Sequence, residues 1–171
     1  MKLHVRSLSR RDSSGWVTLG PLRFPCALGR SGRSVDKREG DWATPIGQFA
    51  IRRGYYRQDH LRRPQSGLPF AAIRPAEGWC DAAGDRNYNR KVEHPYPASA
   101  EHMWRPDGLY DVVLVLDHNA RPRVQGRGSA VFVHVARPGY TPTAGCVALR
   151  RDHLIRLLKN LRPGARIVIH A

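Results

Sequence analysis

The feature of this chain that most constrains its fold is a pair of strand-length apolar runs. The first, Asp111–Asp117, reads DVVLVLD, and the second, Ala130–Val135, reads AVFVHV. The residues His118–Pro122, which follow the first run, have the composition of a turn. Short runs of β-branched and aromatic residues bounded by turn residues are typical of β-strands. The two runs therefore predict two strands of a β-rich fold.

The rest of the chain adds further strands and a single helix. Residues Arg151–Leu161 place leucines at helical spacing, and Pro163-Gly164 would end that helix. A chain of 171 residues is long enough for one domain with a hydrophobic core. We therefore expect a single, mainly β domain with some α structure over residues 1–171, without a linker or a repeat. The further predicted strands cover residues 2–6, 16–19, 22–28, 47–53 and 165–169.

Residues 55–106 have a different composition from the rest of the chain. They are rich in Pro, Gly, Arg, Asp and Asn, with aromatic residues between them, and Arg86–Lys91 is their most polar cluster. A loop of this length in a compact domain is typically functional. Two interpretations stay open: a solvated surface loop, or a substrate-facing wall that offers cations and amides to a carboxylate-bearing ligand.

The charge of the chain is strongly positive, with 29 Lys and Arg against 14 Asp and Glu and a formal net charge of +15. Such a field attracts polyanions or acidic small substrates. The basic residues are scattered as short pairs, and no helix-turn-helix, RNA-recognition or zinc-finger pattern accompanies them. We therefore do not expect nucleic acid to be the partner.

The N-terminal segment and the cysteines bear on the cellular compartment. Residues 1–11 alternate instead of forming the apolar core of a secretory signal, and no stretch approaches the roughly 20 apolar residues of a membrane span. The three cysteines, Cys26, Cys80 and Cys146, are an odd number far apart and give no disulfide framework. We expect a cytoplasmic protein without a membrane span; a removed leader or non-standard export would make it periplasmic.

Cys146 is the best candidate for a nucleophile among the three cysteines. Cys26 lies in an apolar run, where a buried inert thiol is the default, and Cys80 has no histidine nearby in sequence. Cys146 follows Gly145, which permits a close backbone approach, and His134 closes a predicted strand twelve residues upstream. A free thiol has a pKa of about 8.5, so it needs a base such as this imidazole to react. A buried structural Cys146 is the alternative.

The histidines also raise the question of a metal. The chain has 8 histidines, but neither an H-E-x-x-H pattern nor a pair of C-x-x-C motifs occurs. We therefore expect no metal and no other cofactor.

Two motifs together resemble the YkuD-type L,D-transpeptidase family. One is Thr143–Leu149 (TAGCVAL) with His134 before it, and the other is Thr44–Phe49 (TPIGQF), a turn that enters a strand. The segment that precedes Thr44–Phe49 also resembles the family, as do the helix and strand that follow Thr143–Leu149. The resemblance therefore spans roughly residues 20–170. It implies a curved β-sandwich or barrel whose C-terminal helix packs near the cysteine loop.

The motifs depart from the family pattern at three positions. Ala144 stands where the family has a second histidine, Ala148 stands where it has an arginine, and Val135 replaces the usual glycine after the catalytic histidine. His134 still matches the family's upstream histidine, so the departures affect the surroundings of the nucleophile more than its base.

The resemblance implies a cysteine acyltransferase that acts on diaminopimelate-containing peptidoglycan stem peptides. Cys146 would be the nucleophile and His134 its base, and the N–H groups of Cys146 and Gly145 would hold the oxyanion. A backbone carbonyl or the Thr143 hydroxyl would orient the imidazole. A terminal D-amino acid leaves, and the thioester is resolved by an amine in a transpeptidase or by water in an L,D-carboxypeptidase.

Three functional alternatives therefore remain at this point. They are an L,D-transpeptidase, a cytoplasmic L,D-carboxypeptidase of peptidoglycan recycling, and a non-catalytic module that binds peptidoglycan or a polyanion. The partner would be a stem peptide or a soluble muropeptide, and the protein itself is expected to be a monomer. The residues expected to bind the carboxylates of the substrate are Arg86, Tyr88, Trp104 and Arg105.

Overall fold

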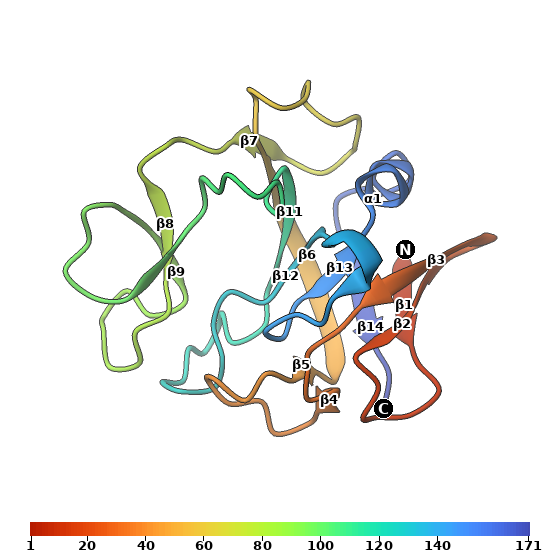
Figure 1. The fold of residues 1–171 in the computed structure, drawn as a ribbon, viewed down its shortest axis with the longest axis horizontal. Coiled ribbons are helices and arrows are strands. Elements are labelled where there is room, and N and C mark those ends of the chain that lie inside the picture. The colour runs from red at the N-terminus through yellow and green to blue at the C-terminus, as the bar shows by residue number, and fades with distance from the viewer.

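Eight strands close into a barrel, in the order β11-β12-β13-β3-β2-β1-β14-β6, and β6 pairs back onto β11 (Figure 1). The structure is a computed structural model that describes residues 1–171. The expectation of a mainly β barrel with one C-terminal helix is confirmed. The barrel strands are β1 (Lys2–Arg6), β2 (Ser14–Leu19), β3 (Leu22–Ala27), β6 (Gly47–Tyr56), β11 (Val112–Leu116), β12 (Phe132–Val135), β13 (Val147–Leu149) and β14 (Arg166–Ile169).

The central strand β11 is buried on both of its faces. Val112, Leu114 and Leu116 belong to the core inside the barrel, whereas Val113 and Val115 belong to a second apolar cluster outside it. Because side chains alternate along a strand, a strand covered on both faces needs apolar residues at every position. This explains why its sequence is a continuous apolar run.

A small second sheet covers the outer face of β11, and it falls within the segment for which the sequence predicts a long loop. The strands of this antiparallel sheet have the order β10-β8-β9, and Figure 1 shows β8 and β9 beside the barrel. The expectation of an irregular segment over residues 55–106 is therefore wrong in part. The strands of this segment are short, and the many Pro and Gly residues between them give it the composition of a loop. These strands are β8 (Glu77–Cys80), β9 (Arg90–Glu93) and β10 (Ala100–His102), and β7 (Phe70–Ala72) extends the edge of β6.

The helix α1 (Arg151–Leu158) follows β13 directly and packs three leucines into the barrel core. It ends three residues earlier than the sequence predicts, because the N–H groups of Asn160 and Leu161 bond to carbonyls three residues back. No helix has the length and apolar character needed to cross a membrane. The remaining elements are β4 (Arg33–Ser34), β5 (Thr44–Pro45) and the 3-10 turn η1 (Pro138–Tyr140).

Candidate active site

A cavity of about 540 Å³ lies on the outer face of β12 and β13, and it contains the side chains of Cys146 and His134. Its walls come from residues 30–42, from the 129–131 and 137–145 loops, and from the small sheet and the segment that follows it. A concave site of this size that contains a thiol and an imidazole is a candidate active site.

The parallel pairing of β12 and β13 explains why these two side chains share the cavity. Val133 pairs with Val147 and His134 pairs with Ala148. Cys146 therefore lies beside Phe132, and the Phe132 N–H points to Sγ at 3.4 Å. Side chains two residues apart on a strand face the same side, so Cys146 and His134 project from the same face of the barrel wall.

The loop before the nucleophile is tied to the end of β3. Thr143 forms an isolated parallel bridge with Gly29, its N–H donates to the carbonyl of Leu28 at 2.8 Å, and its own carbonyl accepts from Arg30 at 3.0 Å. The Thr143 hydroxyl donates to the carbonyl oxygen of Cys146 at 2.7 Å. This hydroxyl therefore holds the nucleophile loop in shape and does not bond to the imidazole.

Glycine is the only residue type that fits at position 145 of this loop. Its φ is +136°, and a Cβ on it would lie 2.9 Å from the carbonyl oxygen of Ala43. Both the backbone conformation and the lack of space exclude other residues. The glycine thus lets the Thr44 turn approach the nucleophile loop directly.

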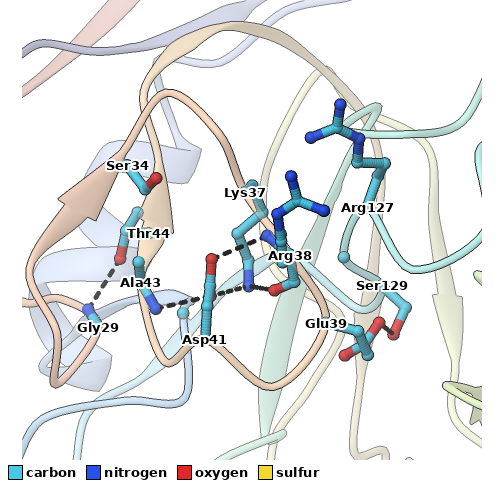
Figure 2. Close-up of polar contacts among 12 residues, drawn as sticks. Gly29, Ser34, Lys37, Arg38, Glu39, Asp41, Ala43, Thr44, Arg127 and Ser129 are labelled. Carbon is cyan, nitrogen blue, oxygen red and sulfur yellow. Dashed lines mark hydrogen bonds and ion pairs between the residues drawn. The ribbon is translucent and has the colours of Figure 1, made fainter.

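Thr44 connects the two sequence motifs, although they lie about one hundred residues apart. Its side chain is fully buried, and its hydroxyl accepts a hydrogen bond from the N–H of Gly29 at 2.8 Å (Figure 2). The same hydroxyl lies 3.5 Å from the carbonyl oxygen of Cys146 and donates to it. The Thr-Pro motif is therefore part of the support of the nucleophile.

The thiol and the imidazole are both neutral near pH 7. Burial raises the pKa of the Cys146 thiol to about 12, and the Glu101 carboxylate acts in the same direction. Burial also lowers the pKa of His134 to about 4, although the hydrogen bond to Val135 opposes this shift. Sγ donates to the carbonyl of Ala130 at 3.2 Å and is not hydrogen-bonded to the imidazole. The resting site is thus a neutral pair and not a thiolate–imidazolium ion pair.

The tautomer of His134 is set by its own backbone. Nδ1 lies 2.8 Å from the carbonyl oxygen of Val135, an acceptor, so Nδ1 carries the proton. Nε2 is left with its lone pair, as a general base requires. The edge of the Tyr110 ring packs against the imidazole at 5.4 Å between ring centroids. Of the two orienting groups that the sequence leaves open, the structure shows the backbone carbonyl.

The comparison with known protein families agrees with this arrangement. The family model YkuD, the L,D-transpeptidase catalytic domain, matches residues 8–169. This chain belongs to the YkuD family. It is an enzyme of the L,D-transpeptidase family, and the resemblance noted in the sequence is confirmed. A search of curated proteins finds no match.

The walls of the YkuD cavity carry charges of both signs. Arg105 pairs with Asp107 at 2.7 Å and, more loosely, with Glu101 at 3.5 Å. Glu101 accepts a hydrogen bond from the Tyr110 hydroxyl at 2.6 Å, and burial raises the pKa of this carboxyl. Asp81 lines the same wall, and its buried Oδ1 has no hydrogen-bond partner. Acidic groups therefore face the cavity from the small sheet, which the sequence does not indicate.

Only one of the four residues expected to bind substrate, Arg105, lines the cavity. Tyr88 is buried, and its hydroxyl is bonded to the Glu39 carboxylate. Trp104 lies under the Arg57 guanidinium, 3.8 Å from the ring centroid, outside the cavity. Arg86 is exposed on a turn away from it. Their polar or aromatic composition suggested a binding wall, but their partners are elsewhere in the protein.

Of the two N–H groups expected to hold the oxyanion, those of Gly145 and Cys146, only one is available in this site. The Gly145 N–H donates to the Thr143 hydroxyl at 3.1 Å and is therefore already engaged. The Cys146 N–H is not hydrogen-bonded within the protein, so it remains available to a substrate oxygen. The structure has no group of three or more His, Cys, Asp or Glu residues arranged to hold a metal ion.

Sequence reasoning missed several residues of the cavity. Lys37, Trp42 and Glu101 all line it, yet none stands inside either motif. Lys37 and Trp42 belong to the approach to the Thr-Pro turn, where a charged stretch resembles a solvated loop. Glu101 lies on a three-residue strand that is too short to be recognised by its pattern.

Proposed function

We propose that this protein is a cysteine acyltransferase that acts on diaminopimelate-containing peptidoglycan stem peptides through a thioester at Cys146. One observation carries the proposal. Cys146 and His134 project from adjacent parallel strands into one cavity, and the imidazole keeps Nε2 unprotonated. A thiol and a general base in one cavity are what nucleophilic acyl transfer needs.

In the first half of the reaction, the proton of the Cys146 thiol passes to Nε2 of His134. Sγ forms a bond to the carbonyl carbon of the diaminopimelate residue, and the carbonyl π electrons move onto its oxygen. The Cys146 N–H, which has no partner within the protein, would donate to this oxyanion. The carbon–nitrogen bond then breaks, the imidazolium gives its proton to the departing D-amino acid, and a thioester remains.

In the second half, a nucleophile gives a proton to His134 and attacks the thioester carbon. The carbon–sulfur bond breaks, and the proton returns to Sγ. An amine of a second stem peptide yields a cross-link, whereas water yields a shortened peptide. The cavity of about 540 Å³ has the size of a single small-ligand site. Because water needs no second peptide site, this size favours L,D-carboxypeptidase activity as the second candidate function.

The charges of the cavity fit such a donor. A diaminopimelate side chain ends in an ammonium and a carboxylate, and stem peptides carry further carboxylates. Asp81 and Glu101 are suited to the ammonium, while Arg30 and Arg105 are suited to carboxylates. A site with both signs of charge suits a zwitterionic residue better than a polyanion, which disfavours the non-catalytic polyanion-binding alternative.

Two measurements on the purified protein test the proposal. Incubation with a carbapenem should give a covalent adduct by intact-mass spectrometry on the wild type and on Cys26→Ala, but not on Cys146→Ala. Incubation with a disaccharide tetrapeptide should then yield tripeptide if water resolves the thioester, or a dimer if an amine does. Absence of a wild-type adduct together with an unchanged tetrapeptide would overturn the assignment.

A further inference from the structure

The neutral resting site leaves one electrostatic problem unexplained. Acyl transfer creates negative charge first on Sγ and then on the substrate oxygen, in a place where burial already disfavours it. The ionisable groups that act on the thiol are His134, Glu101, Tyr110 and Lys37. The cavity is also lined by Asp81, Glu39 and three arginines, of which Arg105 and Arg137 are paired with Asp107. Glu101 opposes the new charge, and Tyr110 and the imidazole are neutral. Lys37 is the only cation among the four groups that act on the thiol.

Lys37 lines the cavity and is largely buried. Its side chain is only 6% exposed, and Nζ donates to the Asp41 carboxylate and, at 2.7 Å, to the carbonyl of Arg38 (Figure 2). Its aliphatic stem packs on the nucleophile loop, since a Cβ at Gly145 would lie 3.6 Å from Cε of Lys37. A cation is therefore fixed directly beside the residue that precedes Cys146.

Asp41, the ion-pair partner of Lys37, holds the ammonium from outside the cavity. The Asp41 carboxylate also accepts the N–H groups of Arg38 at 2.8 Å and Ala43 at 2.9 Å. Partial burial opposes ionisation of Asp41, but these bonds and the ammonium outweigh it and lower its pKa. Lys37 lines the cavity, whereas Asp41 does not. An ammonium has three N–H donors, and two are used here, so one is free.

We propose that Lys37 is a charge-stabilising residue of the acyl transfer: its ammonium favours the anionic sulfur of Cys146 and the substrate oxyanion, and Asp41 fixes it in position. The oxyanion part of this assignment rests on the proposed function. The part that concerns the sulfur holds for any electrophile that reacts with Cys146. The two parts can therefore be tested separately.

The test is the rate at which iodoacetamide alkylates Cys146 in the folded protein, followed on the Cys146 peptide by mass spectrometry. Below the pKa of the thiol, this rate follows the thiolate fraction. Lys37→Met keeps the length of the side chain and removes its charge, so the rate should fall about tenfold, equivalent to one pKa unit. Lys37→Arg keeps the charge and should restore most of the rate.

Two further variants separate charge from structure. Arg127→Met removes a cation from an exposed ion pair with Asp36 that lies outside the cavity, and its alkylation rate should stay at the wild-type value. Asp41→Asn keeps a side-chain oxygen that can accept from Lys37 and so holds it in position, but it removes the counter-charge, so alkylation should be as fast as in the wild type or faster. A merely structural ion pair would instead slow Lys37→Met and Asp41→Asn alike.

The proposal is overturned if folded Lys37→Met is alkylated at the wild-type rate. It is also overturned if Lys37→Met and Asp41→Asn lose alkylation rate equally. If Lys37→Met does not fold, as judged by circular dichroism, the Asp41→Asn and Lys37→Arg rates decide in the same way. Because iodoacetamide needs no stem peptide, a normal alkylation pattern with no turnover of stem peptides would overturn the proposed function and leave the role of Lys37 intact.

Discussion

At the scale of single residues, the site depends on His134 being neutral and correctly protonated. The Val135 carbonyl fixes the proton on Nδ1, and burial lowers the pKa of the imidazole to about 4. His134→Ala should therefore abolish acylation of Cys146 by a carbapenem, because His134 is the only histidine that lines the cavity. Acylation at the wild-type rate in that variant would show that another base acts. That base would not be His102, which stacks on His94 at 3.7 Å between ring centroids, outside the cavity.

The lowered pKa of His134 also predicts how stability depends on pH. The unfolded histidine, with a pKa near 6.5, takes up a proton more readily than the folded one, so unfolding is favoured as the pH falls from about 6.5 toward about 4. The loss amounts to about 3 kcal/mol at most. Urea unfolding should show a lower free energy of unfolding near pH 4.5 than near pH 7 in the wild type, and a much smaller difference in His134→Gln. Equal pH dependence in the two proteins would contradict the buried neutral imidazole.

Thr44 offers a second test at this scale. Thr44→Val keeps the shape of the side chain but leaves the Gly29 N–H and the Cys146 carbonyl without this partner. A buried group left unsatisfied costs about 1–3 kcal/mol. We expect a lower thermal midpoint and a slower acylation of Cys146, whereas Thr18→Val, on a partly exposed strand, should change neither. Unaltered acylation would mean that the motif does not position the nucleophile.

At the scale of elements, the junction between the Thr44 turn and the nucleophile loop depends on Gly145. Gly145→Ala should destabilise the protein and slow acylation, since the new Cβ would meet the backbone oxygen of Ala43, which cannot move like a side chain. Gly84→Ala is a suitable control, because nothing lies within 4 Å of its Cβ although its φ is also positive. Equal melting temperatures for the two variants would contradict the close approach.

The elements also show what sequence patterns can and cannot predict. Continuous apolar runs identify β11 and β12, and leucine spacing identifies α1, because each pattern extends over several residues. The small sheet is missed because its strands have three or four residues and owe their pairing to distant partners. For the same reason the motifs lead to Cys146 and His134, but not to Glu101 or Lys37, which reach the cavity through tertiary structure.

At the scale of the whole molecule, the net charge of +15 should assist the capture of acidic substrates. For an anionic stem peptide we expect kcat/KM to fall by about threefold or more between about 0.05 M and about 0.5 M salt, because salt screens exposed charges. The effect should lie mainly in KM. The reaction with an uncharged carbapenem ester as the acyl donor should depend little on salt. Equal salt dependence for the two donors would contradict electrostatic capture.

The order of the barrel strands limits when this protein can fold during synthesis. β14 follows all other barrel strands in sequence, yet it lies between β1 and β6 and pairs with both. Until those residues have left the ribosome, β1 and β6 have no strand between them, although β3 can already pair with β13 and β6 with β11. The barrel on whose outer face Cys146 lies is closed only after that last insertion. A chain interrupted before β14 is thus expected to lack an organised thiol site, so that reactivity is acquired in one late step.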